Sequence, residues 1–361
     1  MARLRSGRKT QEEKELKGNE ESEDKQIKRS LSCSQLMFKI IKNTIVVVVC
    51  IYLASPIISL LFPGAITQVI FLNLFGKRWF SDDLSYPESA AINCTGTRNL
   101  YIDSTDGVKL GTWQVLPVSV QEKSNNRDDD FFDQVLADGK PIVIYFHGNG
   151  GTRASSHRVQ TYKILAQLDY HVIATDYRGY ADSSGWPSAQ GIFEDAESVY
   201  HWARRVGKGS PVYLLGHSLG TGVAARVSKR LCDAGTCPAG VILETPFSSL
   251  HDAFMHHPFA IPFWVMPGYL WLHAYAMNDT IEAFHSDQCM SSILCPILIL
   301  HAEDDAIVPF HLGQKLYKIA KEVRPESAGP VKFVNFGRNG YGHKHICDSP
   351  ELPAIMKEFI V

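Results

Sequence analysis

The 361-residue sequence predicts an α/β protein in which helices cover both faces of a mostly parallel β-sheet. From residue 99 onward, short apolar runs alternate with longer stretches of helical length, which is typical of strands joined by helices. These apolar runs are nearly continuous, as expected of strands that are buried on both faces. The length and the 45% hydrophobic content suffice for one large domain with a substantial core and a small appendage.

The N-terminal part is expected to be a membrane anchor. Residues 1–43 are charged and poor in aromatic residues, so we expect a disordered cytosolic tail. Residues 44–62 carry no charged side chain and are about long enough to cross a hydrocarbon layer of ~30 Å. The alternatives are a buried helix of the globular domain and a cleaved signal peptide, which fits less well so far from Met1. Residues 63–98 then form a juxtamembrane segment, and residues 99–361 form the globular domain.

The charges around this span predict its orientation. Basic residues are more frequent before the span than after it, so the positive-inside rule sends the globular domain to the lumen of the endoplasmic reticulum or the cell exterior. Asn93 and Asn278 lie in glycosylation triplets, which agrees with this orientation. In an oxidising lumen Cys232 and Cys237 are a nearby candidate disulfide pair. The basic residues before the span are Lys25, Lys28, Arg29, Lys39 and Lys42, and those that closely follow it are Lys77 and Arg78.

The elements of the globular domain follow in order. Strands are expected in residues 111–117, 141–148, 171–179, 212–218, 240–246, 296–305 and 331–336. Helices are expected in residues 159–168, 192–205, 220–231 and 312–323, with a last helix ending at Phe359. The polar residues 121–134 are expected to form a surface loop.

The pentapeptide GHSLG joins the strand at 212–218 to the helix that follows. A strand that turns sharply into a helix needs small residues on each side of the turn, and Gly216 and Gly220 meet this need around Ser218. This arrangement exposes a serine hydroxyl at the carboxyl end of the sheet, where a base and an acid can activate it. The N–H of Leu219, at the start of the helix, is a candidate donor to an oxyanion.

Candidates for the acid and the base occur later in the chain. Glu303, Asp304 and Asp305 follow an apolar strand, and the spacing of the last to the Val-Pro pair favours Asp305. His343 and His345 lie on the loop after the final strand, and we favour His343. The resulting order of serine, aspartate and histidine is the order found in α/β-hydrolases.

A glycine-rich loop, HGNGGTR, ends the strand at 141–148 and predicts a second oxyanion donor. The backbone N–H of Asn149 is the candidate, because the glycines let the chain approach the reacting carbonyl closely. His147 is expected to brace this loop rather than act as a second base. Asp176 and Arg178 are expected to order the loops around the site, with no chemical role.

An aromatic-rich insertion interrupts the alternating pattern at about residues 250–290. An insertion at this place can form a lid over the serine, and its apolar side chains suit a long acyl chain. The alternatives are that these side chains pack on the sheet or contact the bilayer. His251, His256 and His257 are expected to be surface residues, because no carboxylate or cysteine completes a metal ligand set at suitable spacing.

The composition narrows the functional classes. The net charge of -2 and the lack of a basic patch give no support to nucleic-acid binding. The eight cysteines include no CxxC pair, so neither a zinc ribbon nor a redox motif is indicated. No metal and no cofactor is expected to be needed; the expected partners are a lipid substrate and the membrane.

Five segments carry a resemblance to a known family: HGNGGTR, DYRGYADSSGWPS, GHSLGTGVA, LILHAEDDAIVPF and GYGHKHI. They resemble the α/β-hydrolase domain-containing serine hydrolases, in the branch of lysophosphatidylserine and monoacylglycerol lipases. The similarity runs from the membrane span to the C-terminus. By position it implies Ser218 as nucleophile, Asp305 as acid and His343 as base. It also implies long-chain lysophospholipids or monoacylglycerols as the substrate class.

The sequence thus predicts a membrane-anchored serine hydrolase that cleaves the acyl ester of a long-chain lipid through an acyl-enzyme. An acyl-protein thioesterase is the second hypothesis, and a luminal domain argues against it because palmitoylated cysteines are cytosolic. A catalytically silent lipid-binding protein is the third. The intact serine, aspartate and histidine argue against that reading, because a silent site need not keep all three.

Overall fold

The computed structural model describes residues 35–55, 57–58, 60–62, 68, 71–72, 84–89, 91–124, 127–264, 268, 271–272, 275, 280 and 283–361. The chain divides into two compact units, residues 1–58 and residues 59–361, and each is described by itself.

The N-terminal unit contains one helix, Gln35–Ser55, among its described residues. Its 21 residues have a mean hydropathy of 2.0 in the most apolar window, and none of that window is buried. By length and composition this helix could cross a membrane, as expected of the predicted anchor. It begins before the predicted boundary at Thr44, because apolar residues already dominate residues 36–41, where Lys39 is the one charged side chain.

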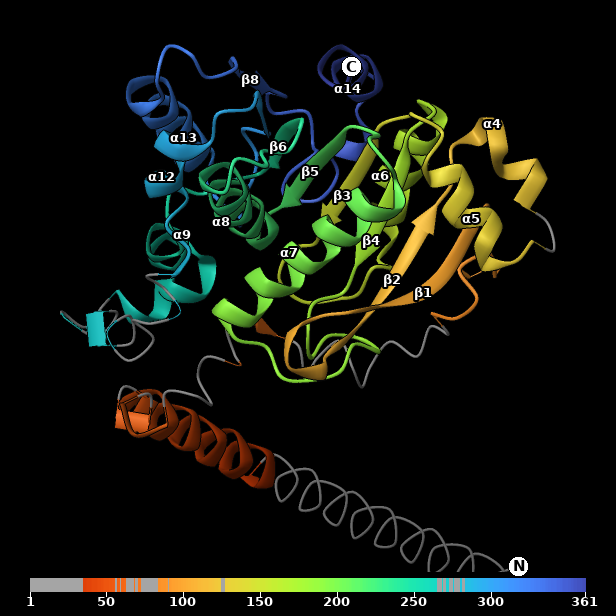
Figure 1. The fold of residues 1–361 in the computed structure, drawn as a ribbon. Helices are drawn as coiled ribbons and strands as arrows, with labels where there is room; N and C mark the ends of the chain where they lie inside the picture. The colour runs from red at the N-terminus through yellow and green to blue at the C-terminus, as the bar shows by residue number, and fades with distance from the viewer. Residues whose placement is uncertain are drawn as a thin grey trace, which may run out of the picture. The chain divides into compact units, whose positions relative to one another are not determined.

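The second unit is built on one eight-stranded sheet with the order β1-β2-β4-β3-β5-β6-β7-β8 (Figure 1). β2 pairs antiparallel with β1 and with β4, and all later pairs are parallel. The strands are β1 (Thr97–Asp103), β2 (Lys109–Val115), β3 (Ile142–Phe146), β4 (His171–Thr175), β5 (Val212–His217), β6 (Gly240–Glu244), β7 (Ile297–His301) and β8 (Val331–Asn335).

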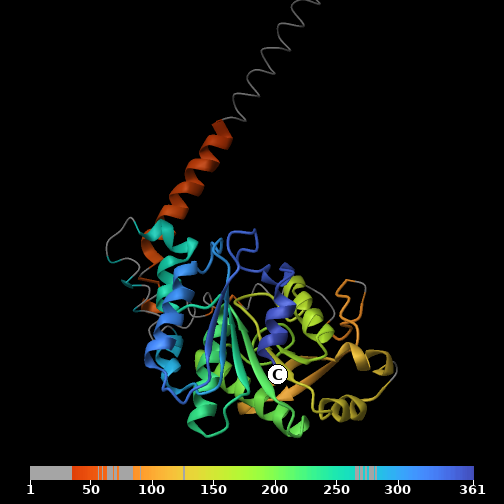
Figure 2. The same ribbon diagram turned by 90° about the horizontal axis from the view of Figure 1, so that it is seen from above.

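Helices lie on both sides of this sheet (Figure 2). α7 (Ala189–Val206), α8 (Leu219–Asp233) and α13 (Phe310–Val323) contribute apolar residues to one core. α6 (Ser156–Gln167) and α14 (Leu352–Phe359) contribute to a second core on the opposite face. The shorter helices are α4 (Val118–Gln121), α5 (Asp129–Leu136), α9 (Leu250–His256) and α12 (Ser286–Cys289), with 3-10 turns at Thr105–Gly107, Glu122–Ser124, Pro258–Phe263, Met290–Ser292 and Ile346–Asp348. The predicted fold class, a mostly parallel sheet covered on both faces, is confirmed.

The expectation of a plain surface loop at residues 121–134 is wrong, because this segment contains the start of helix α5. The Asp128 side chain accepts a hydrogen bond from the N–H of Phe131 and so caps the helix. Phe132 and Leu136, four positions apart, are buried on one face. The run of acidic residues that suggested a solvated loop is therefore the favourable charge of a helix N-terminus.

The second unit also includes residues before Asn99. Phe71 belongs to the first core, and Leu84, Ile92 and Cys94 belong to the second. Strand β1 begins at Thr97. Part of the predicted juxtamembrane segment is thus packed into the globular unit.

Candidate active site

Ser218 occupies a sharp turn between β5, which ends at His217, and α8, which begins at Leu219. Its backbone has φ 53° and ψ −116°, a strained conformation for a residue with a side chain. A Cβ at Gly216 would strike the backbone of Gly220, and a Cβ at Gly220 would strike the backbone of Phe146. Glycine is therefore required on both sides of the serine, as the spacing predicted.

The structure brings Ser218, His343 and Asp305 into one hydrogen-bonded chain. The Ser218 hydroxyl lies 2.9 Å from His343 Nε2, and His343 Nδ1 lies 2.8 Å from Asp305 Oδ2. This arrangement is that of a nucleophile, a base and an acid that orients the base.

Asp305 is held in its ionised form. Burial opposes its ionisation, but hydrogen bonds with His301 and His343 outweigh that cost and keep the pKa of Asp305 below its usual range. Its Oδ1 accepts the backbone N–H groups of Ile307 and Val308 at 2.8 and 2.9 Å, which fixes the carboxylate toward the imidazole.

The rejected candidates have other contacts. His345 is exposed, and its Nδ1 lies 3.2 Å from an oxygen of Asp348. Glu303 accepts a hydrogen bond from Asn335. Asp304 accepts the N–H groups of Gly340 and Gly342 at 2.6 and 2.9 Å. Asp304 therefore holds the loop that carries His343.

The glycine-rich loop after β3 approaches the serine closely. A Cβ at Gly148 would lie 3.1 Å from the Ser218 Cβ, so the peptide between Gly148 and Asn149 lies beside Ser218. Leu219, the other predicted donor, is the first residue of α8. Both predicted oxyanion donors therefore belong to segments that adjoin Ser218.

The residues expected to order this region are all buried in polar contacts. His147 Nδ1 lies 2.8 Å from the Gly148 carbonyl, and burial lowers its pKa well below the usual value, so the ring is neutral and suited to bracing. Asp176 accepts the backbone N–H of Arg153 and also its guanidinium. Arg178 pairs with Asp195.

Comparisons with known proteins bear on this geometry. The family model described as alpha/beta hydrolase fold matches residues 141–286. Lysophosphatidylserine lipase ABHD12 of Rattus norvegicus is 40% identical over 338 residues, which cover 93% of this chain and 84% of that protein. The chain belongs to the ABHD12 family of α/β-hydrolases. Protein ABHD12B of Homo sapiens is 36% identical over 296 residues, which cover 82% of this chain and 80% of that protein.

Solved structures share the fold of this ABHD12-family chain. The Pyrococcus furiosus esterase Pf2001 aligns with a TM-score of 0.53 at 20% identity and covers 78% of this chain and 94% of its own. Est1E from Butyrivibrio proteoclasticus aligns with a TM-score of 0.51 at 18% identity, covering 72% and 96%. The predicted fold, family and enzyme class, a serine hydrolase acting on carboxylic esters, are confirmed by these comparisons together.

The segment predicted to form a lid, about residues 250–290, is held together at its base. Ser249 and His285 form a β-bridge, and the N–H of Leu250 donates to the Phe284 carbonyl. Some described apolar residues between them are buried, such as Ala253 and Ala260, but four large side chains are more than half exposed: Ile261, Trp264, Trp271 and Tyr275. Asn278 and several other lid residues lie outside the described residues.

Of the three histidines predicted to lie at the surface, two do so. His251 and His256 are exposed, whereas His257 is half-buried and burial lowers its pKa. Within the described part of the chain, no group of three potential metal ligands occurs.

His217 is a site residue that the sequence reasoning missed. Its Nε2 lies 2.9 Å from the backbone carbonyl of His343, and the ring is buried. Burial, with a smaller contribution from His343, lowers its pKa well below the usual value, so the neutral ring donates one hydrogen bond to the loop that carries His343. Its position directly before Ser218 in GHSLG was the one sequence feature that could have marked it as a residue of this site.

Glu244, the last residue of β6, was also missed. Its carbonyl accepts the N–H of Ser218 at 3.0 Å, so it anchors the sharp turn. Its carboxyl is buried, and burial raises its pKa to about 8. The sequence gives no signal that Glu244 anchors this turn. A carboxylate at the end of a buried strand is equally typical of a residue that begins a catalytic loop.

This raised pKa predicts a pH-dependent stability. In the folded state the Glu244 carboxyl stays protonated up to about pH 8, whereas in the unfolded chain it loses its proton at about pH 4.3. The folded state therefore binds more protons in this window, and stability falls as the pH rises, by up to about 1.4 kcal/mol per pH unit. Glu244→Gln should remove this contribution.

Denaturant unfolding of the detergent-solubilised protein at several pH values between about 5 and about 8 measures this slope. Glu358→Gln, which changes a glutamate with an exposed side chain on α14, is the matched control and should keep the wild-type slope. An unchanged slope in Glu244→Gln would show that this carboxyl is ionised in the folded protein.

Proposed function

We propose that this protein is a membrane-anchored serine hydrolase that cleaves the acyl ester of long-chain lysophospholipids or monoacylglycerols. The observation that carries the proposal is the hydrogen-bonded chain from Ser218 through His343 to Asp305. Its relative in Rattus norvegicus is named a lysophosphatidylserine lipase, which supports the substrate class.

Acylation would begin at Ser218. His343 Nε2 takes the hydroxyl proton while the serine oxygen attacks the ester carbonyl, and Asp305 stabilises the imidazolium that forms. The backbone N–H groups of Leu219 and Asn149 donate to the oxyanion. His343 then gives its proton to the departing glycerol oxygen, and the fatty acyl group remains on Ser218.

Deacylation repeats these steps with water. His343 takes a proton from the water, which attacks the acyl-enzyme carbonyl, and the same donors stabilise the second oxyanion. The serine leaves with the proton from His343, and a free fatty acid is released. This sequence uses no metal and no cofactor.

The lid supports a long acyl chain as the cleaved group. Trp264, Trp271 and Tyr275 are large apolar side chains that remain more than half exposed. Covering such side chains with acyl methylenes stabilises a complex by about 0.8 kcal/mol per methylene.

A panel of lipids tests this substrate class. We expect the detergent-solubilised protein to release fatty acid from lysophosphatidylserine or a long-chain monoacylglycerol, as measured by mass spectrometry, and Ser218→Ala to release none. A palmitoylated cysteine peptide is the comparison substrate. Hydrolysis of the thioester alone would favour the acyl-protein thioesterase hypothesis, and no hydrolysis of any substrate would favour a lipid-binding protein.

We further propose that the catalytic unit faces the lumen of the endoplasmic reticulum or the cell exterior. The excess of basic residues before the span supports this orientation. Asn93 is exposed, as a glycosylation acceptor must be. A disulfide joins Cys232 and Cys237, the predicted pair, and disulfides persist in oxidising compartments.

This orientation predicts the result of a glycosidase assay. Treatment of the membrane-expressed protein should increase its gel mobility, and Asn93→Gln should reduce that shift. Protease added to sealed microsomes should trim the N-terminal tail and spare the catalytic unit until detergent is added. Digestion of the catalytic unit in intact vesicles would reverse the proposed topology and move the thioesterase hypothesis forward.

A further inference from the structure

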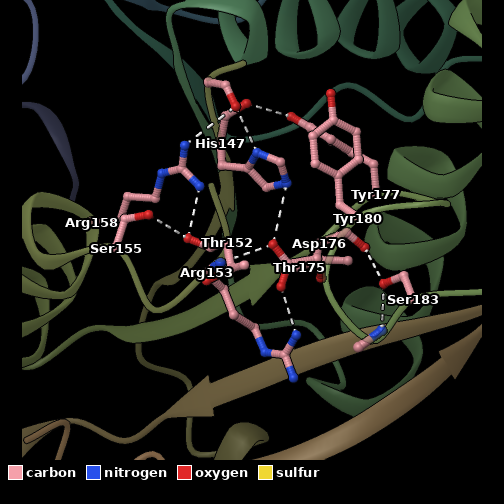
Figure 3. A network of polar contacts seen from close by, with 12 residues as sticks. His147, Thr152, Arg153, Ser155, Arg158, Thr175, Asp176, Tyr177, Tyr180 and Ser183 are labelled. Atoms are coloured by element: carbon pink, nitrogen blue, oxygen red, sulfur yellow. Dashed lines mark hydrogen bonds and ion pairs between the residues drawn. The ribbon is translucent and has the colours of Figure 1, made fainter. Parts of the chain in front are cut away.

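Arg158, on helix α6, is a buried cation with an unusual set of partners. Its side chain is only 3% exposed. It donates to the carbonyls of Thr152, Gly150 and Gly148 at 2.8, 2.7 and 3.3 Å. Figure 3 shows its guanidinium beside His147 and Thr152, on the loop that follows β3. Within the described residues, no carboxylate forms an ion pair with it.

These contacts have a consequence for the peptide between Gly148 and Asn149. In a trans peptide the C=O and the following N–H point in opposite directions. The Gly148 carbonyl is bound by Arg158 and by His147 Nδ1, so the Asn149 N–H is directed away from both. Gly148 itself lies against Ser218, since a Cβ there would be 3.1 Å from the serine Cβ.

The loop needs such a restraint because its glycines allow other conformations. Gly150 and Gly151 have φ of 68° and 69°, in the left-handed region. If the Gly148–Asn149 peptide flipped, it would present a carbonyl oxygen to the developing oxyanion instead of an N–H. Hydrogen bonds from a guanidinium are charge-assisted, and the short ones to Gly150 and Thr152, at 2.7 and 2.8 Å, hold the loop just after this peptide. At the peptide itself, the 3.3 Å contact from Arg158 adds to the 2.8 Å bond from His147 Nδ1 and polarises the peptide toward donation.

We propose that Arg158 is a positioning residue that presets the oxyanion hole by fixing the carbonyls of the loop behind it. The inference rests on the proposed function, because it assigns Asn149 as a donor in that reaction. A buried guanidinium without a carboxylate partner is costly to keep, and a purely structural contact could be made by an uncharged side chain. The three carbonyls that it binds all belong to residues 148–152.

The test compares Arg158→Gln and Arg158→Lys with the wild-type protein, using p-nitrophenyl butyrate as substrate. Loss of a whole oxyanion donor costs about 10² to 10³ in kcat, so a misoriented donor should cost about 10-fold to 100-fold in Arg158→Gln. KM should change less than about twofold, because ground-state binding does not need the hole. The inhibition constant of a trifluoromethyl ketone, whose adduct with the serine carries an oxyanion, should rise by the same factor as kcat falls.

Arg98→Lys is the matched control, since Arg98 on β1 is also buried but pairs with Asp129 and Asp133 far along the sheet from β5. Its kcat should remain within about twofold even if its melting temperature falls. Rates are expressed per active site, titrated with a fluorophosphonate, so a misfolded fraction does not count. If Arg158→Gln does not fold, Arg158→Lys should still show a smaller loss of kcat with the parallel change in inhibition.

Two results would contradict the inference in different ways. Arg158 variants with wild-type kcat per site and wild-type inhibition, whatever their stability, would reduce Arg158 to a structural residue and leave the proposed function intact. Absence of ester hydrolysis in the wild-type protein would overturn the proposed function and this inference together.

Discussion

Ser218→Ala is expected to abolish ester hydrolysis, with a loss of about 10⁶-fold in kcat, the scale seen when a catalytic serine is removed. The variant lacks the hydroxyl oxygen that forms the acyl-enzyme in the proposed mechanism. Labelling by a fluorophosphonate should disappear as well, since the probe needs the same hydroxyl. Activity on p-nitrophenyl butyrate and gel fluorescence of the labelled protein measure the two effects.

The fold of this variant should survive. Alanine keeps the backbone of the turn, and the His217-to-Leu219 segment is anchored by the bond from the Ser218 N–H to the Glu244 carbonyl. The melting temperature of Ser218→Ala should therefore lie close to that of the wild-type protein. Labelling at full strength in this variant would mean that another residue is the nucleophile.

His343→Ala should cause a loss of similar size, roughly 10⁵ to 10⁶-fold in kcat, because the serine then has no base. The matched control is His345→Ala, on the same loop but exposed and paired with Asp348. Its loss should be less than about tenfold, a change of ~1.4 kcal/mol in the barrier. Steady-state kinetics on p-nitrophenyl butyrate distinguish the two.

Free imidazole provides a second readout for the same variant. A base supplied from solution can partly replace the missing ring, so imidazole should raise the residual rate of His343→Ala and leave His345→Ala unchanged. If His345→Ala proves the more damaging change, the base has been assigned to the wrong histidine.

Much of the site could be predicted from the sequence because its residues follow strand ends. Ser218 follows β5, Asp305 follows β7 and His343 follows β8, and the carboxyl ends of parallel strands meet at one edge of a sheet. Gly216 and Gly220 mark the turn, since side chains there would strike the backbone. Because β5, β6, β7 and β8 are consecutive in the sheet, the side chains of Ser218, Asp305 and His343 lie close together.

The residues that hold this site in place were not predictable in the same way. Arg158 lies in the first turn of helix α6 and binds carbonyl groups of the preceding loop, and a carbonyl leaves no trace in the sequence. Asp304 binds two backbone N–H groups, and such partners are equally invisible in the sequence. Glu244 is identified only by its burial, which depends on how β6 packs against its neighbours.

The missed helix α5 has a related cause. Its acidic first turn was interpreted as a solvated loop, although carboxylates stabilise a helix at that end. The burial of Phe132 and Leu136 depends on tertiary contacts that local polarity does not indicate.

The most direct test of the central claim is to identify the residue that a long-chain fluorophosphonate modifies. The probe forms a stable adduct with an activated serine, and its alkyl chain imitates the fatty acyl group. The expected result after proteolysis and mass spectrometry is one adduct, on the peptide that contains Ser218, and none in His343→Ala under the same conditions. An adduct on a different serine of the wild-type protein, with Ser218 unmodified, would contradict the account.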